Sequence, residues 1–373
     1  MKKISILISL FIVTSCSDYS KDSSELPGRL GNPEMSLKND PRAIPAVTKV
    51  MSEYGLDALA PDPPISIDAT QKEKVDYMTS LEPAYEEIFK SWYSELPEIE
   101  GLERSIEVID GVDGNQITLY IHKPEKQNSN IPGILHIHGG GMSILKASNP
   151  NYVRWRDDLA STGLVVVGVE FRNVAGELGS HPFPAGLNDC GSALQWMYDN
   201  KDKLGVSKII VSGESGGGNL TLATALKAKK DEKIFQIDGV YAQCPYISNE
   251  YHRSINYLPS LVENNGYFLN VNDMAVMATA YDGPDSKNPL AWPLFAKTED
   301  LTNLPPHVIS VNELDPLRDE GLLYYKKLLN AGVDASSITI NGTVHAGDMI
   351  FIKATPKIYR SSLMHINNFA NSL

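Results

Sequence analysis

One short segment near the middle of the chain most constrains what it can fold into. Residues 213–217 read GESGG; a β-branched apolar run, 208–212, precedes them, and an Ala- and Leu-rich stretch, 219–230, follows. These flanks predict a buried strand and then a helix, so Ser215 is expected on a sharp strand-to-helix turn. Such a turn needs small residues two positions before and after the serine, and both are glycine. The pattern G-x-S-x-G is that of a nucleophile elbow, although a glycine-rich turn of another α/β protein also produces it.

The length and composition limit the size of the fold and the kinds of partner that the chain can have. With 373 residues, 42% of them hydrophobic, the chain can bury a substantial core, and its length suits one large domain with a smaller attachment. The formal net charge is −13. Because there is no basic field to attract phosphates, we expect no nucleic-acid partner.

The N-terminal residues have the pattern of a targeting segment. Two lysines precede an apolar stretch, 4–13, that is too short to span a bilayer. The stretch leads into VTSC, which ends at Cys16 and resembles the bacterial lipobox; an ordinary signal that ends at a cysteine by chance is the alternative. We predict a lipoprotein signal peptide over 1–15, a lipid on Cys16 and a flexible tether over 16–39. The protein is then expected to be exported and anchored in a bacterial membrane, facing the periplasm or the cell surface.

The rest of the chain divides into two predicted parts. Residues 40–100 carry helical patterns with apolar residues on one face, which predicts N-terminal cap helices. In 101–373, two β-rich runs, 105–110 and 116–122, are joined through an Asp-Gly hairpin signal. Strands and helices alternate after that, which predicts a mostly parallel sheet covered on both faces. A stretch at about 248–288 is expected to be a second cap segment, inserted into this catalytic domain.

A second glycine-rich segment follows an earlier strand. The predicted strand 133–137 is followed at once by HGGG, residues 138–141. Consecutive glycines let bare backbone N–H groups approach a ligand closely, and such donors can form an oxyanion hole. A flexible loop is the alternative for any glycine run. The order along the chain, with this loop on an early strand and the elbow two strands later, is the one that an α/β-hydrolase requires.

Candidate partners for the serine follow in the order acid, then histidine. The predicted strand 308–311 leads into three acids, Glu313, Asp315 and Asp319. Asp315 lies just past the strand and before a proline, where a turn can direct it at an imidazole, and we favour it; Asp319 is expected to hold the loop or begin the next helix. Two histidines follow. His345 lies between a predicted strand and the closing helix, whereas His365 falls within a helical pattern and is expected to be a packing or surface residue.

Together the HGGG segment and the segment 213–219, GESGGGN, resemble the bacterial hormone-sensitive-lipase family of carboxylesterases, known as family IV, within the α/β-hydrolase fold. The resemblance covers about 108–373 and includes DPLRD at 315–319, whose first Asp is the triad acid in that family. It implies a central, mostly parallel β-sheet with helices on both faces and a helical cap. Met142 and Glu214 depart from residues that are frequent in the family, an aromatic and an Asp, but leave the chemistry intact.

The resemblance also implies a site and a reaction. The implied catalytic triad is Ser215, Asp315 and His345, and the implied oxyanion hole is formed by the backbone N–H groups of Gly140, Gly141 and Gly216. Such a site cleaves carboxylic esters through an acyl-enzyme, and the family prefers short to medium chains. The expected partner is a small-molecule ester, and no metal or organic cofactor is expected.

Several alternatives stay open. A non-catalytic binding lipoprotein on a hydrolase fold would also explain the anchor, and a peptidase of the same fold would also use a triad. The sequence leaves a homodimer open. Cys190 and Cys244 are either free buried thiols, which we favour, or a disulfide. Five tyrosines are expected to pack between cap and core, with the lining of a substrate pocket as the alternative: Tyr54, Tyr85, Tyr251, Tyr257 and Tyr267.

Overall fold

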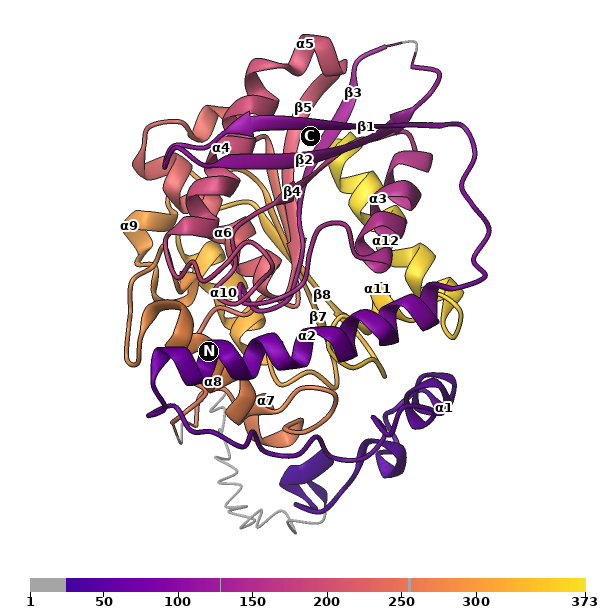
Figure 1. The fold of residues 1–373 in the computed structure, drawn as a ribbon, viewed down its shortest axis with the longest axis vertical. Helices are drawn as coiled ribbons and strands as arrows, with labels where there is room; N and C mark the ends of the chain where they lie inside the picture. Colours follow the sequence, from indigo (N-terminus) through magenta and orange to yellow (C-terminus); the bar gives the residue numbers. More distant parts are fainter. Residues whose placement is uncertain (1–24, 128, 254–255) are drawn as a thin grey trace, which may run out of the picture.

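The computed structural model describes residues 25–127, 129–253 and 256–373. These residues form one eight-stranded sheet in the order β1-β2-β4-β3-β5-β6-β7-β8 (Figure 1). The strands are β1 (Leu102–Asp110), β2 (Gln116–Pro124), β3 (Ile131–Ile137), β4 (Val165–Glu170), β5 (Val206–Glu214), β6 (Gly239–Gln243), β7 (His307–Asn312) and β8 (Ala335–Ile340). Strand β2 runs antiparallel to both β1 and β4, and all other neighbours are parallel. The predicted mostly parallel sheet is confirmed.

The hairpin of β1 and β2 at the edge of the sheet turns at the Asp-Gly pair, as the sequence predicted. Strands β1 and β2 pair in register from Leu102 with Pro124 to Asp110 with Gln116. The turn between them contains Gly114 at a φ of 78°, a conformation that glycine adopts without steric cost.

Helices cover both faces of the sheet, as the alternating pattern predicted. Figure 1 shows α3 (Pro150–Ser161) and α12 (Pro356–Ser372) on one side of the sheet. On the other side lie α4 (Ala185–Asp199), α6 (Gly216–Lys230) and α10 (Arg318–Asn330). Shorter helices lie in the connections: α5 (Lys201–Leu204), α9 (Thr298–Leu301) and α11 (Gly347–Ile350). Strands β3 to β7 are therefore almost wholly buried, which explains their nearly continuous apolar sequences.

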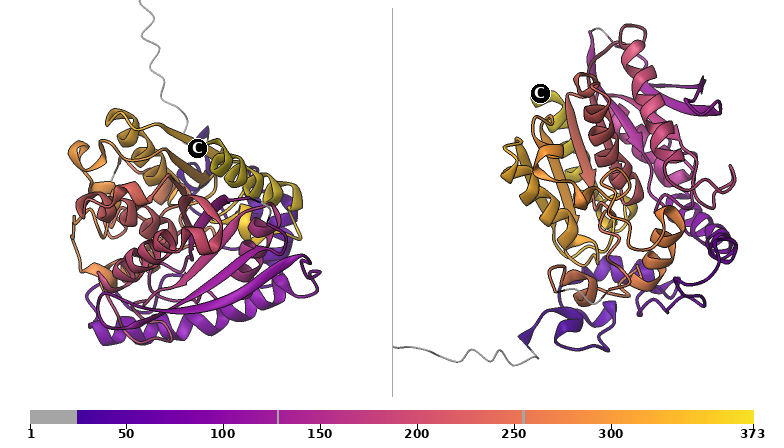
Figure 2. Two further views of the ribbon diagram at one scale, coloured as in Figure 1. Left: turned by 90° about the horizontal axis from the view of Figure 1, so that it is seen from above. Right: turned by 90° about the vertical axis from the view of Figure 1, so that its left-hand side faces the viewer.

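Two segments far apart in the sequence form the cap. The N-terminal one supplies α1 (Pro45–Ser52) and α2 (Gln71–Tyr93), and the inserted one supplies α7 (Ser260–Glu263) and α8 (Val271–Asp282). Helix α2 begins at a capping box, in which Thr70 and Glu73 satisfy each other's backbone N–H groups. The Tyr77 hydroxyl on α2 donates to Asp273 on α8, with 2.5 Å between the oxygens. Figure 1 and the right-hand view of Figure 2 show both segments at the same end of the sheet.

The predicted tether is shorter than the sequence suggested. The predicted signal peptide and the predicted lipid site at Cys16 lie outside the described residues, but the chain from residue 25 onward packs on the domain. Leu37 is fully buried, and Arg29 donates to the backbone carbonyl of Asn265 at 2.7 Å. Arg42 then pairs with Glu263 beside α7. This segment has few large apolar residues, and the partners that order it come from residues more than two hundred positions later.

Two smaller predictions can be compared with the structure. Cys190 and Cys244 are free, buried thiols, as favoured. Within 25–127, 129–253 and 256–373, no helix is both long enough and apolar enough to cross a membrane.

Candidate active site

Ser215 occupies the sharp turn between β5 and α6. Its φ of 57° is in the region that non-glycine residues rarely adopt, and its N–H is held by the carbonyl of Gln243 at 3.0 Å. The glycines on either side are required by close packing. A Cβ added at Gly213 or at Gly217 would overlap with the carbonyl oxygen of Ile137 on the neighbouring strand. The geometry is that of the nucleophile elbow predicted from the sequence.

The segment 138–142, here called the glycine loop, passes beside this turn. Gly140 and Gly141 have φ values of 97° and 62°, which explains the need for glycine. The backbone nitrogens of Gly141 and Met142 lie so close to Gly216 that a Cβ there would clash with both. Within the described part of the chain, the N–H groups of Gly140 and Gly141 donate to no other group. Gly216 is the first residue of α6, so its N–H group has no partner within that helix. These donors are therefore available to an anionic oxygen.

Two buried side chains shape the glycine loop. Glu214 Oε1 accepts a hydrogen bond of 2.7 Å from the N–H of Gly139, and Glu214 Oε2 lies 3.2 Å from His136 Nε2. Burial raises the pKa of Glu214 to about 8, although the Gly139 hydrogen bond acts in the opposite direction. His138 donates from Nδ1 to the Gly139 carbonyl at 2.9 Å and stacks on Phe171. Burial lowers the pKa of His138 to about 3, so this histidine is neutral at physiological pH.

Asp315 and His345 form a buried pair. His345 Nδ1 lies 2.7 Å from Asp315 Oδ2. The other carboxylate oxygen of Asp315 accepts from the N–H of Leu317 at 2.9 Å, and the side chain of Asn264 holds the Asp315 backbone carbonyl. A fully buried carboxylate in this position fixes the imidazole so that Nδ1 carries the proton and Nε2 is directed elsewhere as a base.

The other two acids and the other histidine have structural partners. Glu313 accepts from the N–H of Gly342, and Asp319 accepts from the N–H of Ser260 at the start of α7. His365 lies on α12, within 3.2 Å of the Tyr241 hydroxyl. Each of these three residues was expected to be structural or was left as an alternative to Asp315, and the structure gives each a partner away from the serine.

The sequence analysis missed Asn312, which supports the histidine loop. This buried residue ends β7, and its Oδ1 accepts from the N–H of Ala346 at 3.1 Å. Its Nδ2 lies 2.8 Å from Thr343 Oγ1 and 2.9 Å from Asp348 Oδ1. A polar residue at the carboxyl end of a buried strand, three positions before an acid, is the signal that could have identified it.

Ser215, His345, Gly140 and Gly141 line one cavity of about 100 Å³ between the sheet and the cap, and Asp315 lies behind His345. Ser215, His345 and the glycine loop form its floor, and α2 and α8 contribute to its walls. The lining is mainly apolar: Tyr85, Phe89, Ile144, Leu145, Tyr152, Tyr246, Phe268, Leu269, Met274, Met277, Leu317, Met349 and Ile350, with Asn151 among them. In the described part of the chain no hydrogen bond joins Ser215 to His345, a looseness that is common in sites without substrate.

The five tyrosines mainly pack, as expected. Only Tyr85 lines this cavity. Tyr251 and Tyr267 are buried in the core, Tyr54 packs edge-on against Trp92, and Tyr257 is half exposed.

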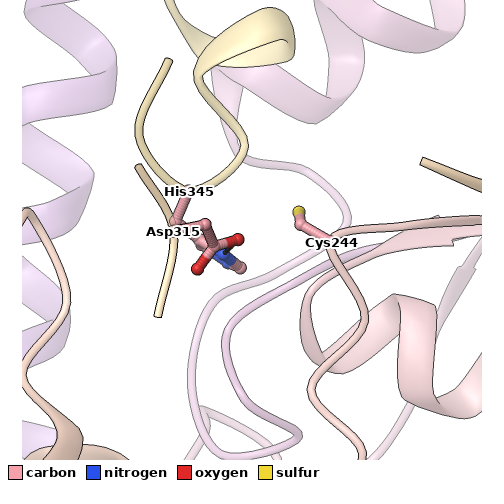
Figure 3. Close-up of side chains that lie close together, drawn as sticks. All are labelled: Cys244, Asp315 and His345. Atoms are coloured by element: carbon pink, nitrogen blue, oxygen red, sulfur yellow. Dashed lines mark hydrogen bonds and ion pairs between the residues drawn. The ribbon is translucent and has the colours of Figure 1, made fainter. Parts of the chain in front are cut away.

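One group of potential metal ligands lies in the described part of the chain, and it includes the candidate pair. The ligand atoms of Cys244, Asp315 and His345 lie within 4.8 Å of one another (Figure 3). Asp315 and His345 are already hydrogen-bonded to each other, and burial raises the pKa of the Cys244 thiol well above its usual value. A neutral thiol is a poor metal ligand, so the group needs no ion to be stable.

Comparisons with known proteins agree with this geometry. A family model described as the alpha/beta hydrolase fold matches residues 134–348, which is more than half of the chain. Among solved structures, one described as brefeldin A esterase, a bacterial homologue of human hormone sensitive lipase, is 42% identical with a TM-score of 0.90. The match covers 92% of this chain and 98% of that one. The esterase Est22 is 35% identical with a TM-score of 0.80, covering 90% and 99%.

Several curated relatives are also named esterases. An arylesterase of Saccharolobus solfataricus is 35% identical over 62% of this chain and 72% of its own length. A carboxylesterase of Mycobacterium tuberculosis is 32% identical over 64% and 72%. The fold, the arrangement of the serine turn and glycine loop, and these likenesses lead to one conclusion: the chain belongs to the hormone-sensitive-lipase-like, family IV esterases of the α/β-hydrolase fold.

Proposed function

We propose that the protein cleaves short-chain carboxylic esters through a covalent acyl-enzyme on Ser215, with His345 as base, Asp315 as its partner and the glycine loop as oxyanion hole. One observation carries the proposal. Ser215, the glycine loop with its uncommitted N–H groups, and His345, which is hydrogen-bonded to the buried Asp315, all line the same cavity or adjoin a residue that does.

The chemistry follows from those positions. His345 removes the hydroxyl proton as Ser215 Oγ attacks the ester carbonyl, and Asp315 stabilises the imidazolium that forms. The carbonyl oxygen becomes an alkoxide, which accepts hydrogen bonds from the N–H groups of Gly140, Gly141 and Gly216. His345 then donates the proton to the departing alcohol. In the second half of the reaction, His345 activates a water molecule that attacks the acyl-enzyme, which releases the carboxylic acid and restores Ser215.

The cavity supports a preference for short chains. The cavity measures about 100 Å³ and is lined mainly by apolar side chains. Its wall contains Met274 and Met277, whose unbranched side chains can adapt to different groups. We therefore expect the rate to be highest for acyl groups of a few carbons and to fall as the chain lengthens.

The protein's relatives favour ester hydrolysis over the two alternatives, a non-catalytic binding protein and a peptidase. The similar structures described above and several curated relatives are named esterases, and no triad position is lost, which speaks against a binding protein without catalysis. A peptidase of the same fold would prefer peptide amides to esters, so the choice of substrate distinguishes it from an esterase. We expect kcat/KM for p-nitrophenyl esters to peak between acetate and hexanoate and to exceed that for peptide p-nitroanilides by orders of magnitude. A preference for the anilides would contradict the proposal.

We further propose that a lipid on Cys16 anchors the mature protein in a bacterial membrane, facing the periplasm or cell surface. The support is the sequence alone, in which VTSC follows a short apolar stretch after two lysines. Mass spectrometry of the native N-terminus tests it. We expect a chain that begins at a diacylated or triacylated Cys16, and an unmodified Cys16 would contradict it.

A further inference from the structure

Among the described residues that line the cavity beside Ser215, Asn151 is the one whose buried side-chain polar atoms lack a hydrogen-bond partner. Asn151, near the start of α3, is fully buried, and it lines the cavity together with Ser215 and the glycine loop. Within the described part of the chain, neither its amide nitrogen nor its amide oxygen has a hydrogen-bond partner within 3.5 Å, and the nearby polar group is the hydroxyl of Tyr152, which lines the same cavity. Most buried polar atoms in folded proteins are paired, so an amide with both ends unpaired requires an explanation.

Packing alone does not explain an asparagine at this position. Its neighbours in the cavity wall are mainly apolar, and a leucine of nearly the same shape would fill the space without leaving polar atoms unpaired. Proteins retain destabilising unpaired polar atoms of this kind mainly at functional sites, where a ligand pairs with them. Asn151 and the proposed nucleophile line the same cavity, so an ester bound at Ser215 shares that cavity with the amide of Asn151.

The two ends of the amide define the chemistry of that group. The nitrogen donates and the oxygen accepts, so the group that satisfies both at once must itself accept and donate. A hydroxyl does this with one oxygen atom. A ketone or ester carbonyl pairs with the nitrogen only, and an alkyl group pairs with neither.

We propose that the cavity selects esters that carry a hydroxyl group near the scissile bond, and that Asn151 is the residue that recognises it. This inference rests on the proposed ester hydrolysis and names its substrate class. We expect hydroxylated esters to be preferred over keto esters, and keto esters over plain alkyl esters. Selectivity of this kind is strong because the wrong substrate leaves buried polar groups unpaired.

Matched substrate pairs test the inference. On the acyl side, p-nitrophenyl 2-hydroxybutanoate, 3-hydroxybutanoate and 3-oxobutanoate are compared with p-nitrophenyl butanoate. On the alcohol side, 2-hydroxyethyl butanoate is compared with propyl butanoate. For at least one pair, kcat/KM of the native protein is expected to favour the hydroxylated ester by about tenfold or more, the range of a buried hydrogen bond. In Asn151→Leu this ratio is expected to fall to near one.

The thermal stability of the variants distinguishes substrate recognition by Asn151 from a structural role of Asn151. Since Asn151 forms no hydrogen bond, the Tm of Asn151→Leu is expected to equal or exceed that of the native protein. The control is Asn367→Leu on α12, whose amide is bonded to Thr162 far from the cavity. This control is expected to lower the Tm and to leave the selectivity ratio unchanged.

The outcomes are distinguishable. If the native protein hydrolyses the plain esters but every ratio is the same in Asn151→Leu, the inference is wrong and the proposed function stands; a lower Tm would then indicate that Asn151 holds a structural water. If the folded native protein hydrolyses none of these esters, the proposed function itself fails.

Discussion

Glu214 Oε1 accepts a 2.7 Å hydrogen bond from the backbone N–H of Gly139. The residue immediately before the candidate nucleophile therefore holds the first glycine of the glycine loop. The two halves of the candidate site, which come from different strands, are joined by this contact. Because Glu214 is fully enclosed and its pKa is raised to about 8, it is mainly a neutral acid at pH 7.

Removing that contact should slow the chemistry. In Glu214→Ala the Gly139 N–H loses its acceptor, and the loop donors are no longer fixed against the oxyanion. We expect kcat to fall by roughly 10- to 100-fold, less than the ~10²–10³ for deleting a donor outright, with a smaller change in KM. Glu214→Gln keeps an acceptor oxygen and should retain most of the activity. A Glu214→Ala protein with the native kcat would show that the contact does not position the loop.

The raised pKa of Glu214 predicts an alkaline limit. Above pH about 8 the carboxyl ionises, and its negative charge lines the same cavity in which the oxyanion develops. Like charges repel strongly in a site of low dielectric, so kcat of the native protein should decline above that pH. The pH profile of Glu214→Gln should lack this decline. Identical alkaline limbs in both proteins would exclude Glu214 as the titrating group.

Glu320 predicts how stability depends on pH. It is buried, accepts from the N–H of Ile247 and the hydroxyl of Tyr251, and burial raises its pKa from 4.5 to about 8. Between those values the unfolded chain has released the proton and the folded chain has kept it. The contribution of Glu320 to the free energy of unfolding is therefore full below pH 4.5 and is lost as the pH rises toward 8.

Urea unfolding at pH 5 and pH 8.5 measures this effect. The loss of stability between the two values should be smaller in Glu320→Gln than in the native protein, because glutamine keeps an acceptor and does not titrate. Other buried acids contribute equally in both proteins and cancel in the comparison. Equal losses would mean that Glu320 ionises normally in the fold.

Asn312 is expected to act as a positioning residue for His345. Asn312→Ala removes the three side-chain hydrogen bonds that hold the histidine loop to the end of β7. We expect a loss of about 1–3 kcal/mol in the free energy of unfolding, the cost of unpaired buried groups, and a larger fall in kcat than rise in KM.

A matched control for Asn312 lies on the same loop. Glu313→Gln keeps an acceptor for the Gly342 N–H and should leave both stability and kcat nearly native. If Asn312→Ala lost stability but kept the native kcat, its role would be structural only.

The sheet and the candidate catalytic residues were predictable because their signals are local. A buried β-branched run followed by GESGG specifies the strand, the turn and the helix that place Ser215, and HGGG specifies bare N–H groups after β3. Asp315 could be chosen from three acids because only it precedes a proline just past the strand. The Asp-Gly pair gave the β1–β2 hairpin for the same reason.

The missed features depend on partners distant in the sequence. Residues 25–39 have the composition of a tether, yet Leu37 is buried and Arg29 is held by the inserted cap segment. Asn151 lies among ordinary helix-starting residues, and only the three-dimensional arrangement places its amide in the cavity beside Ser215. The cap over 40–100 and about 248–288 was predicted, but which residues of α2 and α8 line the cavity depends on how the two segments pack together.

The central claim is tested most directly by the hydrolysis of p-nitrophenyl butanoate by the native protein and by Ser215→Ala. The account predicts turnover by the native protein, a burst of p-nitrophenol when formation of the acyl-enzyme is faster than its hydrolysis, and no turnover above background in a Ser215→Ala protein that retains the native Tm. Turnover that persists in the folded Ser215→Ala variant would contradict the assignment of Ser215 as the nucleophile.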